Sequence, residues 1–122
     1  MPLQVTFRQM DPSDAVQEAI RKRSDKLVQF YDRIVSCRVV VHAPHRHHHK
    51  GKLYSISVDV KVPDGDVAVH RDAVERHAHE DIYVAIRDAF DAAERQLDEL
   101  IHRRRGEVKA RERGGRESDI EA

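Results

Sequence analysis

Cysteine, tryptophan and long apolar runs are scarce in this sequence. Its 122 residues include one cysteine, Cys37, and no tryptophan, and aromatic residues make up only 5%. A single cysteine excludes an intrachain disulfide, and no apolar run reaches the roughly 20 residues of a membrane-spanning helix or the shorter core of a signal peptide. We therefore expect a cytoplasmic protein. Because Cys37 lies in an apolar, alternating stretch, we expect a buried thiol and not a nucleophile.

The sequence also lacks an excess of charge of either sign. Lysine and arginine total 22, aspartate and glutamate total 22, and the formal net charge is zero with histidine neutral. This balance argues against a uniformly basic nucleic-acid binder but leaves room for a locally basic face. Charged residues are 36% and hydrophobic residues 39%, which predicts one domain with a single modest core and a large exposed surface.

One long amphipathic helix is the clearest element that is present. Between His79 and Arg104, apolar residues recur at three- and four-residue intervals, which places them on one stripe of a helix. The stripe consists of Ile82, Ile86, Ala89, Phe90, Ala93, Leu97, Leu100 and Ile101. A helix with one apolar stripe needs a partner to cover it, so we expect a sheet against this face.

The rest of the chain predicts a second helix and four strands. Ser13 is a candidate N-cap for a helix over residues 15–31, in which Val16, Ile20, Ser24 and Leu27 share one face. Alternating apolar residues predict strands over residues 3–7, 34–43 and 53–62, and a fourth that contains Val67 and Val69 after the turn Pro63-Asp64-Gly65. Residues 71–78 are ambiguous: they extend the fourth strand, form a loop, or begin the long helix.

This order of elements predicts an α+β fold. The chain reads β-α-β-β-β-α, with two helices packed on one face of a four-stranded, mostly antiparallel sheet. We assign residues 1–105 to this domain. Residues 106–122 are charged, nearly free of large apolar side chains and interrupted by Gly114-Gly115, so we predict a disordered charged tail.

Histidines gather in two loops of the predicted fold. His45, His47, His48 and His49 lie in one loop, and His77 and His79 lie beside Glu80 in another. Imidazole is a common metal ligand, but a hairpin tip does not hold ligands in fixed geometry, and the spacing in His-Ala-His-Glu-Asp differs from the metalloprotease motif His-Glu-x-x-His. We predict no metal site, no cofactor and no enzyme activity. The alternative is a metal-dependent role, which rests on these histidines alone.

Basic residues on the two predicted helices are the second candidate site. If the helices lie side by side, their cations can face the same way and meet a phosphate backbone. The residues concerned are Arg21, Lys22 and Lys26 of the first helix, Arg87 and Arg95 of the second, and the run Arg103, Arg104 and Arg105. Asp88, Asp91 and Asp98 share the second helix and reduce the positive field. The alternative interpretation is an ordinary solvated surface.

Several short stretches carry a more specific signal. They are HEDIYVAI (79–86), AERQLDEL (93–100), PDG (63–65), VTFRQM (5–10) and DKLVQFYDRI (25–34). Together they resemble the bacterial ribosome hibernation factors, a family that includes hibernation-promoting factor and ribosome-associated inhibitor A and is also labelled sigma-54 modulation protein. The resemblance covers roughly residues 3–105. We expect a short member of the family, the type without a C-terminal dimerisation domain.

The resemblance implies a fold similar to double-stranded-RNA-binding domains and a role in translation regulation. Family members bind the small ribosomal subunit between head and body, cover the mRNA and tRNA sites, and inhibit translation in stationary phase or under stress. The partner it implies is ribosomal RNA, with no membrane and no small-molecule substrate. By position, the eight basic residues named above would make the RNA contacts. The alternative is a protein-interaction or transcription-modulating module without ribosome binding.

Overall fold

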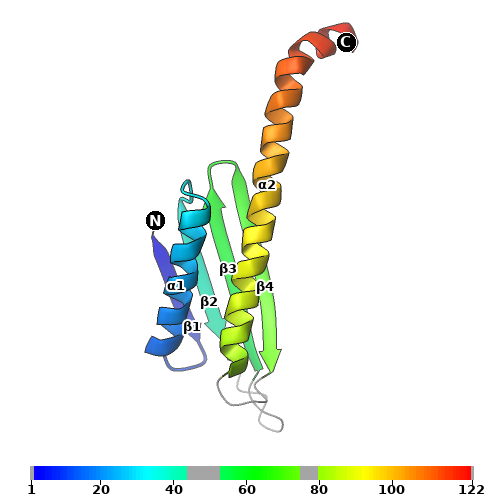
Figure 1. The fold of residues 1–122 in the computed structure, drawn as a ribbon. Coiled ribbons are helices and arrows are strands. Elements are labelled where there is room, and N and C mark those ends of the chain that lie inside the picture. The colour runs from blue at the N-terminus through cyan, green and yellow to red at the C-terminus, as the bar shows by residue number, and fades with distance from the viewer. Residues whose placement is uncertain (1, 44–52, 75–79, 122) are drawn as a thin grey trace.

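A computed structural model describes residues 2–43, 53–74 and 80–121 of the chain (Figure 1). Two helices lie side by side on one face of a four-stranded sheet. The elements in chain order are β1 (Leu3–Arg8), α1 (Asp14–Phe30), β2 (Ser36–His42), β3 (Leu53–Val62), β4 (Gly65–Val74) and α2 (Glu80–Glu121). The predicted α+β class and element order are therefore confirmed.

The sheet is mixed, with strand order β1-β2-β3-β4. β1 pairs with β2 in parallel, while β2 with β3 and β3 with β4 are antiparallel. A parallel pair cannot be joined by a tight hairpin, so the chain must cross over between its strands. Helix α1 is that crossover, and this topology places it on the same face of the sheet as α2 (Figure 1).

Helix α1 begins and faces the core as the sequence predicts. Ser13 has extended backbone angles, and its Oγ accepts a hydrogen bond from the Val16 amide at 3.2 Å. This bond satisfies one of the free N–H groups at the helix start. The buried residues of the helix are Val16, Ile20, Ser24 and Leu27, which are the four that share the predicted face.

The sheet has one apolar face and one solvent-facing side. In the β2–β3 register, Cys37, Val39 and Val41 stand opposite Val60, Val58 and Ile56, and all six are at most 1% exposed. Successive side chains of a strand point to opposite faces. The intervening residues, among them Arg38 and Asp59, therefore form an open sheet face, which we define as the side of the sheet away from the helices.

Cys37 is confirmed as a buried thiol, with 1% of its surface exposed. Burial raises its pKa to about 11, so the thiol stays protonated at neutral pH. The neighbouring Ser24 hydroxyl offsets part of that rise. The Ser24 oxygen itself has no hydrogen-bond partner of normal geometry among the described residues.

Helix α2 covers the other half of the sheet with the predicted stripe. Ile82, Ile86, Ala89, Phe90, Ala93 and Leu97 are buried, and Leu100 and Ile101 pack at the edge of the core. The β3–β4 turn meets the helix at Leu100. A Cβ added at Gly65, whose φ is +152°, would lie 3.5 Å from the Leu100 Cδ2. That distance is an ordinary van der Waals contact, so there is room for a side chain. Glycine is needed at this position because residues with a side chain rarely adopt this positive φ.

Two boundaries differ from the sequence analysis. β4 extends to Val74, so the first residues of the ambiguous segment continue the strand, and residues 75–79 lie outside the described part. Helix α2 continues to Glu121, because glutamate, lysine, alanine and arginine after Arg105 favour helix. Its last turns project beyond the sheet (Figure 1). The division at residue 105 and the disorder of residues 106–122 in solution stay predictions.

A pair of truncations to alanine tests this account of the core. Leu97 and Ser24 are both 0% exposed in helices. Leu97→Ala should lower the free energy of unfolding by about 2–5 kcal/mol, through lost burial and a cavity. Ser24→Ala should raise it by about 1 kcal/mol, because it removes a buried, unsatisfied hydroxyl and improves helix propensity.

Urea denaturation followed by circular dichroism measures both changes. Unchanged stability for Leu97→Ala would contradict the assignment of the α2 stripe to the core. A loss of stability for Ser24→Ala would show that the hydroxyl makes a favourable contact with the Cys37 thiol.

Candidate functional site

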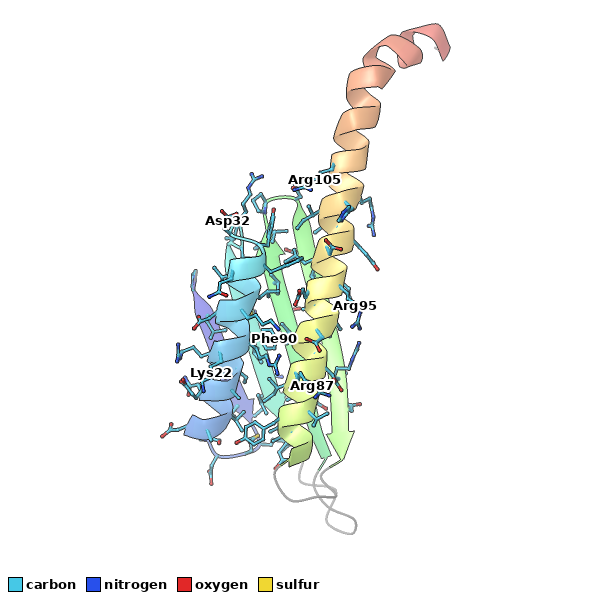
Figure 2. The ribbon with its side chains drawn as sticks, in the orientation of Figure 1. Lys22, Asp32, Arg87, Phe90, Arg95 and Arg105 are labelled. Carbon is cyan, nitrogen blue, oxygen red and sulfur yellow. The ribbon has the colours of Figure 1, made fainter. Side chains whose placement is uncertain are left out.

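The candidate site is the exposed side of α1 and α2 that faces away from the sheet, which we call the outer helix face. Lys22 of α1 and Arg87, Arg95 and Arg105 of α2 all lie on it (Figure 2). Each of these side chains is exposed. Because both helices lie on the same face of the sheet, these four cations share one side of the molecule.

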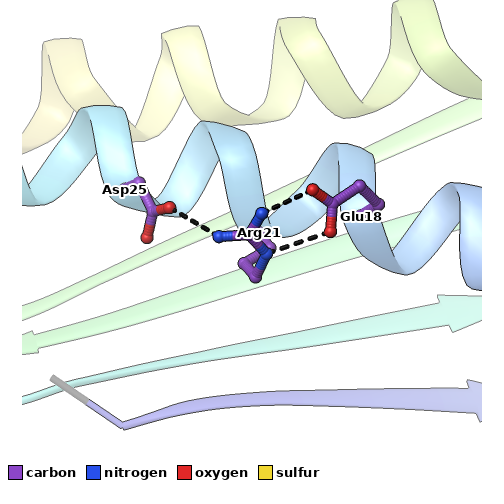
Figure 3. A network of polar contacts seen from close by, with 3 residues as sticks. All are labelled: Glu18, Arg21 and Asp25. Atoms are coloured by element: carbon purple, nitrogen blue, oxygen red, sulfur yellow. Dashed lines mark hydrogen bonds and ion pairs between the residues drawn. The ribbon is translucent and has the colours of Figure 1, made fainter.

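Arg21 is on α1 as predicted, but its guanidinium forms ion pairs with two carboxylates of the same helix. Its Nε donates to Glu18 Oε2 at 3.0 Å and its Nη1 donates to Asp25 Oδ2 at 3.0 Å, while Nη2 makes a short bond to Glu18 Oε1 (Figure 3). The hydrogen bonds to Arg21 hold the pKa of Glu18 below its usual value and raise the pKa of Arg21. With two carboxylates bonded to it, the Arg21 guanidinium presents a weaker positive field to an outside phosphate than a cation without an ion pair does.

Arg87 is paired more weakly. Its Nη2 lies 3.3 Å from Asp88 Oδ1 and its Nε lies 3.4 Å from the same oxygen, and both side chains are about half exposed. An exposed pair of this kind contributes little and opens easily. Arg87 therefore keeps N–H groups of its guanidinium available to donate hydrogen bonds to a ligand.

The other predicted cations are available. No ion pair within the described part of the chain involves Lys22, Lys26, Arg95, Arg103 or Arg105. Arg104 lies on α2 between the last two, and its side chain is outside the described set. Among the cations that Figure 2 places on the outer helix face, Lys22 of α1 and Arg95 and Arg105 of α2 therefore keep their charge available within the described part of the chain.

An open groove of about 340 Å³ interrupts this basic surface. It is lined by Phe30 from the end of α1 and by Asp91, Glu94, Arg95 and Asp98 from α2. Asp91 and Asp98 were predicted to reduce the positive field, whereas Phe30 was not among the predicted site residues. The sequence does hold a signal for Phe30, because it is an apolar residue outside the set Val16, Ile20, Ser24 and Leu27 that shares the predicted buried face. In the structure its side chain is 43% exposed.

The open sheet face carries a polar network of its own. Ser55 Oγ donates to Asp72 Oδ1 at 2.7 Å, His70 Nε2 lies 2.9 Å from the same oxygen, and Ser57 Oγ lies 3.0 Å from His70 Nδ1. The bond from Ser55 and the contact with His70 lower the pKa of Asp72. His70 and Asp72 are 58% and 57% exposed, so water surrounds these groups and the network serves cross-strand pairing.

The described residues include no group of three or more side chains suited to hold a metal ion. His45, His47, His48 and His49, together with His77 and His79, lie outside the described residues. Within the described helices, none is both long enough and apolar enough to cross a membrane.

The solved structures that resemble this fold include two ribosome-related proteins. The structure of a ribosomal subunit interface protein from Coxiella burnetii matches with a TM-score of 0.66 and 19% identity, over 84% of this chain and 99% of that chain. The N-terminal domain of Thermus thermophilus Protein Y matches with a TM-score of 0.63 and 21% identity, over 82% of this chain and 99% of that chain. At these identities the likeness shows the fold alone.

Comparison with curated proteins gives no significant match. A family model does match, and it covers residues 3–105, which is the whole sheet, α1 and the packed part of α2. On this match the chain belongs to the sigma 54 modulation protein / S30EA ribosomal protein family.

Proposed function

We propose that this protein binds the small ribosomal subunit through the outer helix face and inhibits translation by covering the mRNA and tRNA sites in stationary phase or under stress. The observation that carries the proposal is the position of both helices on one face of the sheet (Figure 1). It brings Lys22 and Arg95, which form no ion pair within the described part of the chain, to one side of the molecule. Family membership and the name of the Coxiella relative, a ribosomal subunit interface protein, support a ribosomal partner.

Binding of this kind needs shape and charge but no catalysis. Lysine and arginine of the outer helix face would contact phosphates of ribosomal RNA, arginine in a bidentate manner. Double-stranded RNA is recognised mainly by backbone position and shape, so base identity matters little. A folded domain seated in this way excludes mRNA and tRNA by occupying their space.

The distribution of ion pairs divides the predicted RNA contacts into two groups. Lys22, Lys26, Arg95, Arg103 and Arg105 can reach a phosphate without breaking any described ion pair. Arg21 would have to leave Glu18 and Asp25, and Arg87 would have to leave Asp88. We assign the RNA contacts chiefly to the first group, because each cation that replaces a counterion on RNA adds to affinity and to its salt dependence.

Charge reversal on the two faces of the molecule tests the proposal. Lys22→Glu with Arg95→Glu changes the outer helix face, and Arg38→Glu with Lys61→Glu makes the same change in net charge on the open sheet face. All four side chains are exposed. We expect the first variant to bind small subunits at least about tenfold more weakly, a loss of about 1.4 kcal/mol, and the second to bind within about twofold of the parent protein.

Co-sedimentation with purified small subunits at low and high salt measures the binding, and circular dichroism confirms that both variants fold. Equal losses for the two variants would mean that the ribosome senses net charge only. A larger loss for the sheet variant would place the docking surface on the opposite side.

A finer comparison separates paired from unpaired cations on α1. Lys22→Gln should weaken binding and reduce the slope of log affinity against log salt by about 1, as expected for one lost phosphate contact. Arg21→Gln should leave that slope unchanged, because its charge is already taken by Glu18 and Asp25. The same reduction in slope for both variants would show that Arg21 exchanges its carboxylates for phosphate on the ribosome.

A further inference from the structure

The groove between the end of α1 and the middle of α2 has a composition that RNA binding does not explain. Phe30 forms one wall, Asp91, Glu94 and Asp98 lie along the other, and Arg95 completes the lining. Three carboxylates against one guanidinium disfavour a phosphate inside the groove, so a phosphate would meet Arg95 from outside it. The groove lies on the outer helix face, so a polyanion that docks on the flanking cations must pass over it without entering.

The carboxylates of the groove are available to a cationic ligand. No ion pair of the described residues involves Asp91 or Glu94. Among the described residues, Asp98 pairs with His102 alone, whose Nδ1 lies 3.3 Å from Oδ1 and also 2.8 Å from the Asp98 carbonyl oxygen. Arg95 lines the same groove but lies beyond ion-pair distance of these carboxylates. Their negative charge is therefore not neutralised within the described structure.

Phe30 adds an apolar contact to this charge. It is 43% exposed, whereas Phe90 is 4% exposed and Phe7 packs against the core. An aromatic ring beside carboxylates suits arginine and lysine, because the ring accepts a cation on its face and the aliphatic stem of either side chain covers apolar surface. A ligand with both features fits the groove better than a simple cation.

The spacing of the carboxylates matches an extended chain. From Asp91 to Glu94 and then to Asp98 the helix rises about 4.5 Å and about 6 Å. An extended peptide covers the total of about 10.5 Å with three to four residues, at about 3.3 Å each, and places alternate side chains on one side. Two side chains of such a segment point to that side, about 6.6 Å apart, so two basic residues can reach the three carboxylates, and Arg95 can donate to the peptide's carbonyl oxygens.

We propose that this groove binds an extended, arginine- or lysine-rich segment of a partner protein, with the cations on Asp91, Glu94 and Asp98 and an aliphatic stem against Phe30. This interaction goes beyond RNA contact and does not depend on it. The outer helix face then has two recognition chemistries: cations on its flanks for phosphate and a carboxylate groove in its centre for a basic polypeptide.

Fluorescence anisotropy with the full chain and a labelled peptide of alternating glycine and arginine tests the proposal. A peptide with glutamine in place of every arginine is the charge control. The groove variant is Asp91→Asn with Glu94→Gln, which keeps side-chain shape, and the matched control is Asp59→Asn with Asp66→Asn on exposed positions of β3 and β4.

We expect the arginine peptide to bind and the glutamine peptide not to bind. The groove variant should weaken binding at least about tenfold, Phe30→Leu should weaken it severalfold, and the β3–β4 control should stay within about twofold of the parent. Equal losses for the two carboxylate variants, or binding of the glutamine peptide, would overturn the proposal. So would absence of arginine-peptide binding by the parent protein.

Two further arms identify other occupants of the groove. A labelled single-stranded RNA whose binding falls in the groove variant would overturn the proposal in favour of nucleic acid. A concentration-dependent dimer in sedimentation velocity, abolished by the same substitutions, would overturn it in favour of a second copy that supplies Arg103 to Arg105. No ribosome enters these measurements, so their failure is distinct from failure of ribosome binding.

Discussion

The burial of one apolar face of the sheet is the constraint on which the rest of the structure depends. Val39, Val41, Ile56 and Val58 form the centre of this face and are completely excluded from water. A four-stranded sheet of this width needs two helices to cover it, and the parallel pairing of β1 with β2 makes α1 one of them. Both helices then present their polar sides in the same direction. The outer helix face is therefore built jointly by two helices that are far apart in the sequence.

What this surface binds is decided by which charges remain unpaired. The chain is neutral overall, so net charge does not attract it to RNA. Local pairing makes the difference: Arg21 is neutralised within α1, whereas Lys22, one residue later, points to solvent without an ion-pair partner among the described residues. Three carboxylates of α2, those of Asp91, Glu94 and Asp98, line the groove beside Phe30. A neutral protein thus presents separate basic and acidic regions on one face.

Local patterns predicted much of this fold. The Ser13 cap, the α1 face, the α2 stripe and the Pro63-Asp64-Gly65 turn all depend on neighbours within a few residues, which the sequence displays directly. The parallel β1–β2 pair was not predicted, because it joins residues more than thirty positions apart, such as Leu3 and Cys37. At the site, the pairing of Arg21 with Glu18 and Asp25 follows helix spacing and was readable. The groove could not be predicted in this way, because it forms only where the two helices pack together.

A cryo-electron-microscopy map of the small ribosomal subunit with this protein bound tests the central claim most directly. The account predicts that α1 and α2 face ribosomal RNA, with Lys22 and Arg95 within ion-pair distance of phosphates and the open sheet face in solvent. A map in which Arg38 and Lys61 of the open sheet face meet the RNA, while the outer helix face is left in solvent, would contradict it.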